Sequence, residues 1–504
     1  MFIRLKSAAI VGIDAVEIGI EVDGVRGLPS INIIGLATGA AKESKDRAIH
    51  ALSNSGIKLP PKKITISLTP ADIKKQGSGF DLAIALGLAG LALNKTFDVD
   101  GYLFAAEISL DGTLKPIKGV FPIGVLARKQ NLKLVVCNLN KSEAALSGAE
   151  VYGFDHLLEV LSFLSGEVQR DPYSINIEDF VKKAEYDVDF SSVKGQMKVK
   201  RAAVIAVAGF HNLLLVGPPG VGKSMIAQRI PTILPSMSYD EIIESTKIYS
   251  VCGMLDEKNP IVVKRPFRSP HSGSSDVSLI GGGINAMPGE ITLAHNGVLF
   301  LDEFPEFRRN VIEALRQPLE DSVISVSRAN AKITYPARFL LLAAMNPCPC
   351  GYYGSKKKNC SCSVAQIKKY RSKISGPILD RIDIQVNVAE VDYEKLAYEN
   401  DSFDSKSMRA MVEDAVEVQK RRFKDEPINY NAQMNAEQIK KYCKIGDDSH
   451  NVLKMAVENL GLSARSYSKI LKIARTIADV EHSDEIKPVH IKEAISFRSL
   501  DWDL

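Results

Sequence analysis

Apolar runs separated by turn signals divide the first third of the chain into short strands and one helix. Residues 18–36 have strand, Asp-Gly turn and strand character, and residues 111–112 lie at the centre of a predicted hairpin. The continuous apolar run Leu82–Leu93 is too short to cross a bilayer, which takes about 20 residues, and it predicts a buried helix. We therefore predict an α/β domain with its own core over residues 1–168.

The rest of the chain divides into three further segments. Residues 169–188 are polar and predict a linker. Residues 391–504 are charged, with apolar residues at helical spacing, and predict a helical lid domain. Between them, residues 189–390 carry most of the candidate chemistry.

Length and composition narrow the class of protein. A chain of 504 residues is too long for one core, and 45% hydrophobic with 25% charged residues is typical of a soluble globular protein. The formal net charge of +4 permits a nucleic-acid partner without indicating one. Any basic surface that binds nucleic acid must therefore be local.

The cysteines and the N-terminal segment bear on the compartment. Cys137, Cys252 and Cys443 are scattered, which argues against a disulfide framework and favours a reducing cytoplasm. The first 22 residues are interrupted by Asp14 and Glu17, so they predict strand rather than the apolar core of a signal peptide. We expect a cytoplasmic protein with no membrane partner.

A phosphate-binding loop lies near the start of the segment 189–390. Residues 212–230 read NLLLVGPPGVGKSMIAQRI, which is G-x4-G-K-S after an apolar strand and before a helix. The glycines let backbone N–H groups face the phosphates of ATP, and the helix presents its positive end to them. Lys223 is expected to reach the β- and γ-phosphates, and Ser224 to bind Mg²⁺. The loop residues predicted to contact the nucleotide are Gly217, Pro218, Pro219, Gly220, Val221, Gly222, Lys223 and Ser224.

A pair of acids follows a second apolar strand. Residues 297–304 read GVLFLDEF, which places Asp302 and Glu303 at the strand end. Asp302 fits a Mg²⁺ ligand and Glu303 fits a general base that polarises the attacking water. An adjacent Asp-Glu pair favours a hydrolysing ATPase over a small GTPase, in which a Gln usually positions the water.

A third strand, Arg338–Met345, ends at Asn346. A polar side chain at this strand end can orient the water and sense the γ-phosphate. The alternative is that Asn346-Pro347 merely forms a turn.

Two arginines are candidates for contacts with the transferred phosphate. Arg381 follows a helical stretch and fits a finger that acts on a neighbouring subunit, with an ion pair to Asp380 or Asp383 as the alternative. Arg465, at a predicted helix start, fits a second phosphate sensor, with a solvated helix arginine as the alternative.

Two basic segments are candidate DNA contacts. Residues 322–339 predict a β-hairpin with Arg328 and Lys332 at its tip, where they would supply salt-sensitive affinity for phosphates. Lysines interleaved with tyrosines further on suit single-stranded DNA. This second group consists of Lys356, Lys357 and Lys358, with Tyr352, Tyr353 and Tyr370 nearby. For both segments the alternative is a solvated loop.

Four cysteines cluster within residues 346–362, which read NPCPCGYYGSKKKNCSC. In a reducing compartment, four thiols indicate one tetrahedral Zn²⁺ site rather than two disulfides. The predicted ligands are Cys348, Cys350, Cys360 and Cys362. A site with four protein ligands is closed and structural, although Cys-x-Cys is tighter than the usual spacing and free thiols are the alternative.

Taken together, these motifs resemble the ComM/YifB family of magnesium-chelatase-like AAA+ ATPases over essentially the whole chain. The matching stretches include VGPPGVGKS, RPFRSPH, GVLFLDEFPEF, AAMNPCPCGYYG, SGPILDRID and SARSYSKILKIARTIADVE. The resemblance implies an AAA+ three-layer core with a parallel sheet and a C-terminal helical lid. It assigns Asn346 as sensor 1, Arg381 as the arginine finger and Arg465 as sensor 2, and it implies a hexamer. It also implies a ring helicase that acts on single-stranded or branched DNA and promotes branch migration in natural transformation or homologous recombination.

The N-terminal segment resembles the proteolytic domain of Lon proteases, without its catalytic groups. The place expected for the serine nucleophile falls on Gly79, one position from Ser78, and the place expected for the lysine falls on Phe121 or Ile123. Without that pair, nucleophilic catalysis has no base. We expect an inactive protease-like domain.

Two other functions are compatible with parts of this pattern. A chelatase motor subunit would share the ATPase core, but the Lon-like segment argues against it. An ATP-dependent protease or unfoldase would share both domains, but the missing serine and lysine argue against that.

Overall fold

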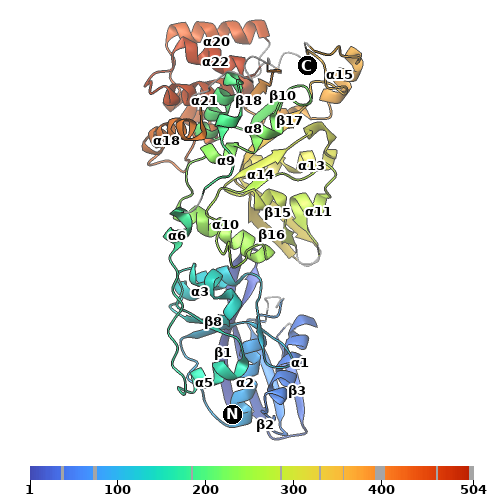
Figure 1. Cartoon of the computed structure of the whole chain (residues 1–504), viewed down its shortest axis with the longest axis vertical. Coiled ribbons are helices and arrows are strands. Elements are labelled where there is room, and N and C mark those ends of the chain that lie inside the picture. The colour runs from blue at the N-terminus through green and yellow to red at the C-terminus, as the bar shows by residue number, and fades with distance from the viewer. Residues whose placement is uncertain are drawn as a thin grey trace. The chain divides into compact units, whose positions relative to one another are not determined.

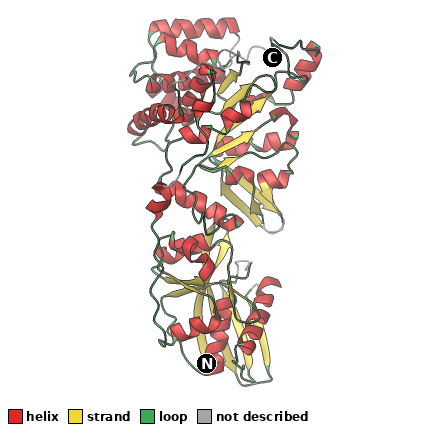
Figure 2. Cartoon of the chain, viewed as in Figure 1, coloured by secondary structure: helices red, strands yellow, loops and turns green. Residues whose placement is uncertain are grey.

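The computed structural model divides into two compact units, each described here by itself (Figures 1 and 2). The first unit comprises Met1–Ala184 and Ser238–Val263, and the second comprises Glu185–Met237 and Lys264–Leu504. The structure describes residues 1–35, 39–71, 77–182, 185–283, 286–328, 331–355, 357–391, 403–460 and 464–498.

The first unit contains two sheets and a short hairpin. The larger sheet has the order β1-β2-β4-β3, with only β3 and β4 parallel, and the smaller one, β5-β8-β9, is parallel. The hairpin β6–β7 encloses residues 111–112, as predicted. The strands are β1 (Phe2–Val11), β2 (Asp14–Val25), β3 (Ser30–Ile34), β4 (Lys63–Thr69), β5 (Tyr102–Ala105), β6 (Glu107–Ile108), β7 (Leu114–Lys115), β8 (Lys133–Cys137) and β9 (Val151–Phe154).

The predicted buried helix is α2 (Asp81–Leu93), and its residues from Asp81 to Leu91 are all buried. Glycine allows it to lie close against β1 and β2: a Cβ at Gly87 would come within 2.5 Å of Val22, and one at Gly90 within 2.5 Å of Ile3. The other helices of this unit are α1 (Gly39–Asn54), η1 (Asn138–Asn140), α3 (Val120–Lys129), α4 (Lys141–Ala145), α5 (Leu157–Leu164), α6 (Ile177–Lys182) and α10 (Tyr239–Cys252).

Helix α10 is distant in sequence from the rest of the first unit but packs within it. Ser238 and Glu241 form a capping box at its start, and Gly253 ends it with φ of 67°. Lys247 pairs with Asp14 at 2.7 Å, and the Ser250 hydroxyl accepts a hydrogen bond from the Phe121 amide at 3.3 Å. These contacts join the segment to β2 and α3.

The second unit is built on a five-stranded sheet with the order β11-β14-β17-β10-β18, all parallel. Its central strands are buried throughout, which explains their continuous apolar sequences. The strands are β10 (Leu213–Val216), β11 (Phe267–Arg268), β14 (Val298–Leu301), β17 (Leu340–Met345) and β18 (Ile384–Asn387). Because the strands are parallel, their carboxyl ends meet at one edge of the sheet, where a ligand site is expected.

An excursion between β14 and β17 contains the predicted hairpin. Strands β15 (Val323–Arg328) and β16 (Ala331–Pro336) pair antiparallel, from Val323 opposite Pro336 to Arg328 opposite Ala331, so the predicted hairpin is confirmed. Its base is fixed because Tyr335 is buried and donates a hydrogen bond to the Ala286 carbonyl at 2.7 Å.

Helices and short strands surround this sheet, and Figure 1 shows α18, α20, α21 and α22 gathered together. Buried Asp479 accepts hydrogen bonds from Arg422 on α18, Arg475 on α21 and Asn431, which ties this helical part together. The helices are η2 (Phe190–Ser192), α7 (Met197–Gly209), α8 (Lys223–Ala227), α9 (Ile230–Ile233), α11 (Asp276–Ile280), α12 (Glu290–Leu293), η3 (Phe304–Glu306), α13 (Arg309–Ala314), α14 (Arg316–Asp321), α15 (Val364–Arg371), α16 (Gly376–Leu379), α18 (Ser405–Arg422), η4 (Asn431–Gln433), α19 (Ala436–Tyr442), α20 (Asp447–Leu460), α21 (Ala464–Val480) and α22 (Pro488–Ser496). Strands β12 (Gly281–Gly282) and β13 (Met287–Pro288) form a small separate pair.

Within the described part of the chain, none of the helices has both the length and the apolar character needed to cross a bilayer.

Candidate nucleotide site

The phosphate loop connects the central strand β10 to helix α8. Gly220 and Gly222 have φ of 81° and 90°, in the left-handed region that favours glycine, so the loop backbone turns sharply before the helix begins. The structure therefore places the G-x4-G-K-S residues between a buried strand and a helix N-terminus, which is the arrangement that binds phosphates.

Lys223 lies under this loop. Its Nζ donates hydrogen bonds to the carbonyl oxygens of Gly217 and Pro218 at 2.7 and 2.9 Å, and to Asn346 Oδ1 at 3.1 Å. Burial lowers the pKa of its ammonium group, and the nearby carboxylates of Asp302 and Glu303 oppose that effect. The lysine is thus already directed toward the strand ends at which a terminal phosphate would lie.

The acid pair stands at the end of β14, beside the loop. Ser224 Oγ donates a hydrogen bond to Asp302 Oδ2 at 2.6 Å, so a hydroxyl and a carboxylate oxygen lie together, as oxygen ligands of Mg²⁺ require. Glu303 is exposed, has φ of 52°, and its backbone N–H donates to Asp302 Oδ1 at 2.9 Å. This bend turns the chain at the strand end and leaves the Glu303 carboxylate facing open space.

These groups line one cavity of about 340 Å³. Its lining includes Lys223 and Ser224 from the loop helix, Asp302 and Glu303 from β14, and Asn346 from the end of β17. Cation, hydroxyl, carboxylates and amide therefore converge from three neighbouring strand ends on one space. This is the set of groups that binds a Mg²⁺-nucleotide and positions a water for phosphoryl transfer.

A second cavity, of about 430 Å³, shares Pro219, Gly220, Gly222 and Met225 with the first. Its lining includes apolar Val193, Val221 and Ile226, and also Tyr352 and Lys358. Because the phosphate loop lines both cavities, the second is the place expected for the nucleoside of a nucleotide whose phosphates bind in the first. Sequence reasoning missed the contribution of residues 192–196, which carry no recognisable nucleotide motif.

Arg381 and Arg465 are absent from the lining of both cavities. Arg381 pairs with Glu320 of α14 and not with Asp380 or Asp383, and its Nη1 donates to the Pro377 carbonyl at 2.5 Å. Burial and the nearby Arg316 and Arg465 guanidinium groups lower the pKa of Arg381.

Arg465 is mostly exposed and pairs with Asp380 at 3.1 Å. The two arginines thus lie near each other and outside their own chain's nucleotide site. Glu320 as a partner of Arg381 could not be recognised from sequence, because it is 61 residues away and on a different element.

The candidate DNA contacts fall largely on residues outside the described part. The side chains of Arg328 and Lys332, at the end of the β15–β16 hairpin, and the whole of Lys356 are among these. Lys357 and Lys358 are exposed, and Lys358 Nζ lies 5.0 Å from the centre of the Tyr352 ring.

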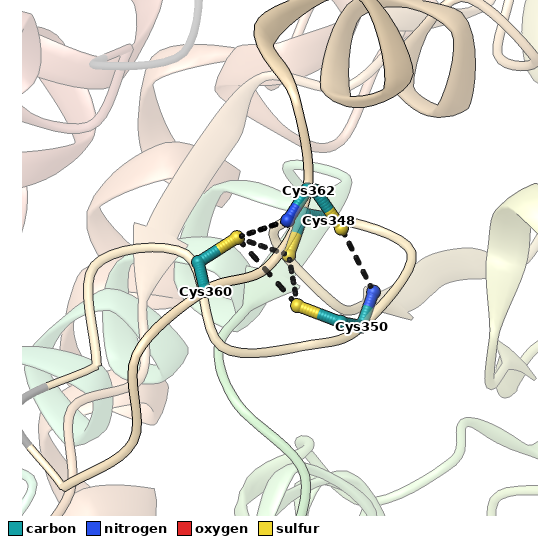
Figure 3. A group of neighbouring side chains, drawn as sticks. All are labelled: Cys348, Cys350, Cys360 and Cys362. Atoms are coloured by element: carbon teal, nitrogen blue, oxygen red, sulfur yellow. Dashed lines mark hydrogen bonds between the residues drawn. The ribbon is translucent and has the colours of Figure 1, made fainter.

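The four predicted zinc cysteines lie together (Figure 3). Their sulfur atoms all fall within 4.8 Å of one another, and those of Cys348, Cys350 and Cys360 are separated by 3.4, 3.5 and 3.6 Å. These values exclude disulfides, whose S–S bond is about 2.05 Å. They approach the edge of about 3.8 Å of a tetrahedron with Zn–S bonds of about 2.3 Å. The backbone N–H groups of Cys350, Tyr353 and Cys362 donate to sulfur atoms of the cluster, as around metal thiolates.

In the first unit, Gly79 and Ser78, at the place of a Lon-type nucleophile, contact Ile117 and Glu107. A Cβ at Gly79 would come within 3.4 Å of Ile117, and Ser78 Oγ donates a hydrogen bond to Glu107. Phe121 and Ile123 are buried apolar residues. In the contacts that the described side chains make here, Ser78 is paired with Glu107 and not with a lysine.

The nucleotide-site residues lie within a part of the chain that matches a known protein family. The model for magnesium chelatase, subunit ChlI, matches residues 189–396, the model for its C-terminal part matches residues 402–498, and a model for subunit ChlI of Mg-chelatase matches residues 20–140. The parallel sheet, the phosphate loop with its neighbouring acids, and the helical part define an AAA+ ATPase of the magnesium-chelatase type. The predicted α/β fold class is confirmed.

Individual relatives narrow this further. The chain is 41% identical to the competence protein ComM of Haemophilus influenzae, with 98% of this chain and 97% of that protein covered. It is 39% identical to the uncharacterized protein YifB of Escherichia coli, with 99% and 97% covered. The zygotic DNA replication licensing factor mcm6-A of Xenopus laevis is 22% identical, with 75% of this chain and 45% of that protein covered. The chain belongs to the ComM/YifB family.

Proposed function

We propose that the protein is a cytoplasmic ATP-driven DNA motor, a hexameric ring helicase that promotes branch migration during natural transformation or homologous recombination. The observation that carries this proposal is the excursion between β14 and β17. It leaves the strand end that holds Asp302 and Glu303, forms the β15–β16 hairpin, and returns through the strand that ends at Asn346. One relative is named a competence protein and another a DNA replication licensing factor, and both names support DNA as the substrate.

In the proposed hydrolysis step, Lys223 neutralises charge on the β- and γ-phosphates while Ser224 and Asp302 hold Mg²⁺. Glu303 accepts a proton from the attacking water, and Asn346 orients that water. Asn346 already accepts a hydrogen bond from Lys223, so the loss of the γ-phosphate would change a contact at the end of β17.

The β15–β16 hairpin is connected through helix α14 to Arg381, the proposed arginine finger. The Gln317 side chain on α14 accepts a hydrogen bond from the Ser325 amide of β15 at 3.1 Å, which holds helix and hairpin together. The same helix pairs through Glu320 with Arg381. A change of nucleotide in a neighbouring subunit that moves Arg381 would therefore pull on the element that supports the hairpin, where Arg328 and Lys332 are proposed to contact DNA phosphates.

The place of Arg381 supports a ring. Its guanidinium lies outside its own chain's cavities, so a role in phosphoryl transfer requires a neighbouring chain's nucleotide. We propose the same arrangement for Arg465, as a phosphate sensor.

Zinc is the proposed occupant of the four-cysteine cluster. Four sulfur ligands with near-tetrahedral separations fit Zn²⁺, and four protein ligands leave no open position for catalysis. Its role would be structural, because the segment that it closes has little core of its own.

A DNA-binding experiment tests the motor. With Glu303→Gln and Mg-ATP, we expect binding to forked and single-stranded DNA that weakens steeply as salt rises, since phosphate contacts release counterions. Glu413→Gln, at an exposed helix pair with Arg409, serves as the matched control and should behave as wild type. The absence of DNA binding at low salt, together with a wild-type ATPase that DNA does not stimulate, would reject the proposal in favour of a chelatase motor or an unfoldase.

A further inference from the structure

The loop that carries the four cysteines, described over residues 347–355 and 357–363, contacts the phosphate loop. It begins directly after Asn346 and ends at the capping box of α15. Gly351 has φ of 86°, and a Cβ at this position would come within 2.8 Å of Pro219 in the phosphate loop. The Gly351 backbone therefore lies in close contact with the Pro219 ring, and its positive φ and this contact both favour glycine.

The same loop forms one wall of the nucleoside cavity. Tyr352, Lys357 and Lys358 line it together with Val221 and the neighbouring residues of the phosphate loop. The Lys358 ammonium lies over the Tyr352 ring and 3.4 Å from its hydroxyl. An aromatic ring and cations beside an apolar surface suit a purine base and its ribose.

Apart from the cysteines, few contacts hold this wall in place. Of the described residues between Cys350 and Cys360, only Gly351 is buried, and the others are half-buried or exposed. Outside the wall, Ser355 Oγ donates a hydrogen bond to Glu390 at 2.8 Å, the Arg371 guanidinium lies 5.6 Å from the centre of the Tyr353 ring, and Gly351 meets Pro219. Ser355 in turn accepts hydrogen bonds from the Lys357 and Lys358 amides. A surface segment this short and this exposed lacks the buried area needed to order itself.

We propose that zinc bound by Cys348, Cys350, Cys360 and Cys362 orders the wall of the nucleoside cavity, so that metal occupancy sets the affinity for ATP. The inference rests on the zinc site proposed above and extends it from a structural staple to a determinant of nucleotide binding. It makes Tyr352 and Lys358 nucleoside-contacting residues rather than DNA contacts.

The test uses the full chain and two separate measurements, zinc content by mass spectrometry and the Kd of a fluorescent ATP analogue with Mg²⁺. Removing zinc from the wild type with a chelator should weaken nucleotide binding at least about tenfold, and adding ZnCl₂ should restore it. Cys360→Ser should lose zinc and bind nucleotide as weakly as the stripped wild type, even with ZnCl₂. Cys252→Ser, which changes a thiol of the first unit, is the matched control and should bind zinc and nucleotide normally.

Tyr352→Ala gives a second, independent measurement if the stripped protein unfolds. It should keep its zinc and its melting temperature while losing nucleotide affinity by about five- to tenfold. Wild type that loses zinc and keeps its Kd within twofold, or a Tyr352→Ala protein with unchanged Kd, would overturn the coupling. Protein that never binds zinc, either as purified or on titration, would instead reject the zinc site itself, and with it this inference, but not the ATPase.

Discussion

Both units place polar groups at a helix N-terminus beside a sheet, and they use those groups in opposite ways. In the second unit, Ser224 and Asp302 lie at the wall of an open cavity. In the first unit, Asp81 at the start of α2 is fully buried and accepts hydrogen bonds from Arg47 at 2.7 and 3.0 Å and from the Ile108 amide at 3.1 Å. Charges around an open space are available to a ligand, whereas charges that satisfy one another inside the protein stabilise the fold.

The comparison clarifies what the first unit retains of a Lon-like domain. Around Gly79 the polar side chains Ser78, Glu107, Asp81 and Arg47 are all engaged with each other or with backbone groups. A resemblance of fold therefore does not carry the chemistry, which resides in the site.

The largest expected effect concerns the arginine that each subunit would supply to its neighbour. Arg381→Ala should lower the ATPase kcat about a thousandfold, because an arginine finger stabilises charge only in the transition state, and should leave the Kd for ATP within about threefold. Steady-state hydrolysis and nucleotide titration measure the two quantities. Glu320→Gln, which frees the arginine from its ion pair within the chain, is the companion variant and should retain most of the activity.

Mixing subunits makes this result decisive. Arg381→Ala subunits have an intact Glu303, and Glu303→Gln subunits have an intact Arg381. Random rings from equal amounts of both should regain about one quarter of wild-type activity, since one interface in four combines the two intact residues. No recovery on mixing would place the arginine at its own chain's nucleotide and remove the main argument for a ring.

Local sequence patterns were sufficient to predict individual helices and strands, but not which elements pack against one another. The helix predicted over Leu82–Leu93 is α2, and the hairpin predicted over residues 322–339 is β15–β16, because periodicity and turn residues are local signals. The packing of residues 238–263 within the first unit depends on contacts such as Lys247 with Asp14, more than 200 residues apart. No local pattern encodes such a pairing.

The same limit applies within the nucleotide site. The phosphate loop and the acid pair could be predicted because each is a short motif between recognisable elements. The contact of the cysteine loop with Pro219 and its place in the lining of the nucleoside cavity could not be predicted, because tertiary folding alone brings Gly351, Tyr352 and Lys358 to the phosphate loop.

The next effect in size tests whether the charges of the first unit are structural. Asp81→Ala should lower the unfolding free energy of this unit by about 3 kcal/mol, because it leaves the Arg47 guanidinium without its buried partner. Hydrogen–deuterium exchange of the α2 amides in the full chain measures this. Asp98→Ala, at an exposed position, is the matched control and should change exchange by less than about 0.5 kcal/mol. Protection of α2 that survives Asp81→Ala would mean that the buried pair contributes little to the fold.

A smaller effect depends on pH. Burial raises the pKa of Glu143 from 4.5 to about 7, partly opposed by hydrogen bonds from Ser250 and the Phe121 amide. Between about pH 4.5 and 7 the folded unit keeps a proton that the unfolded chain has released, so stability falls as the pH rises through this window. Because the carboxyl group is half-buried, the loss should be of the order of 1 kcal/mol.

Glu143→Gln should remove this dependence, since the amide cannot ionise but can still accept both hydrogen bonds. Melting temperatures of wild type and variant at pH 5.5 and 8 should therefore differ mainly at pH 8, where the variant is the more stable. An equal pH dependence in both proteins would assign the titration to another group.

The smallest expected effect concerns the serine of the first unit at the place of a Lon-type nucleophile. Ser78 is the serine nearest the place of a Lon-type nucleophile, but its hydroxyl is hydrogen-bonded to Glu107 and no lysine stands at Phe121 or Ile123. A serine so placed has no base to remove its proton, because a carboxylate at Glu107 is too weak a base to replace a desolvated lysine amine. Cleavage of an unfolded protein with ATP should therefore be at background level in wild type and Ser78→Ala alike, as measured by release of labelled peptides. ATP-dependent cleavage that Ser78→Ala abolishes would show that the first unit acts on a ligand as the second does, and the contrast between the two units would fail.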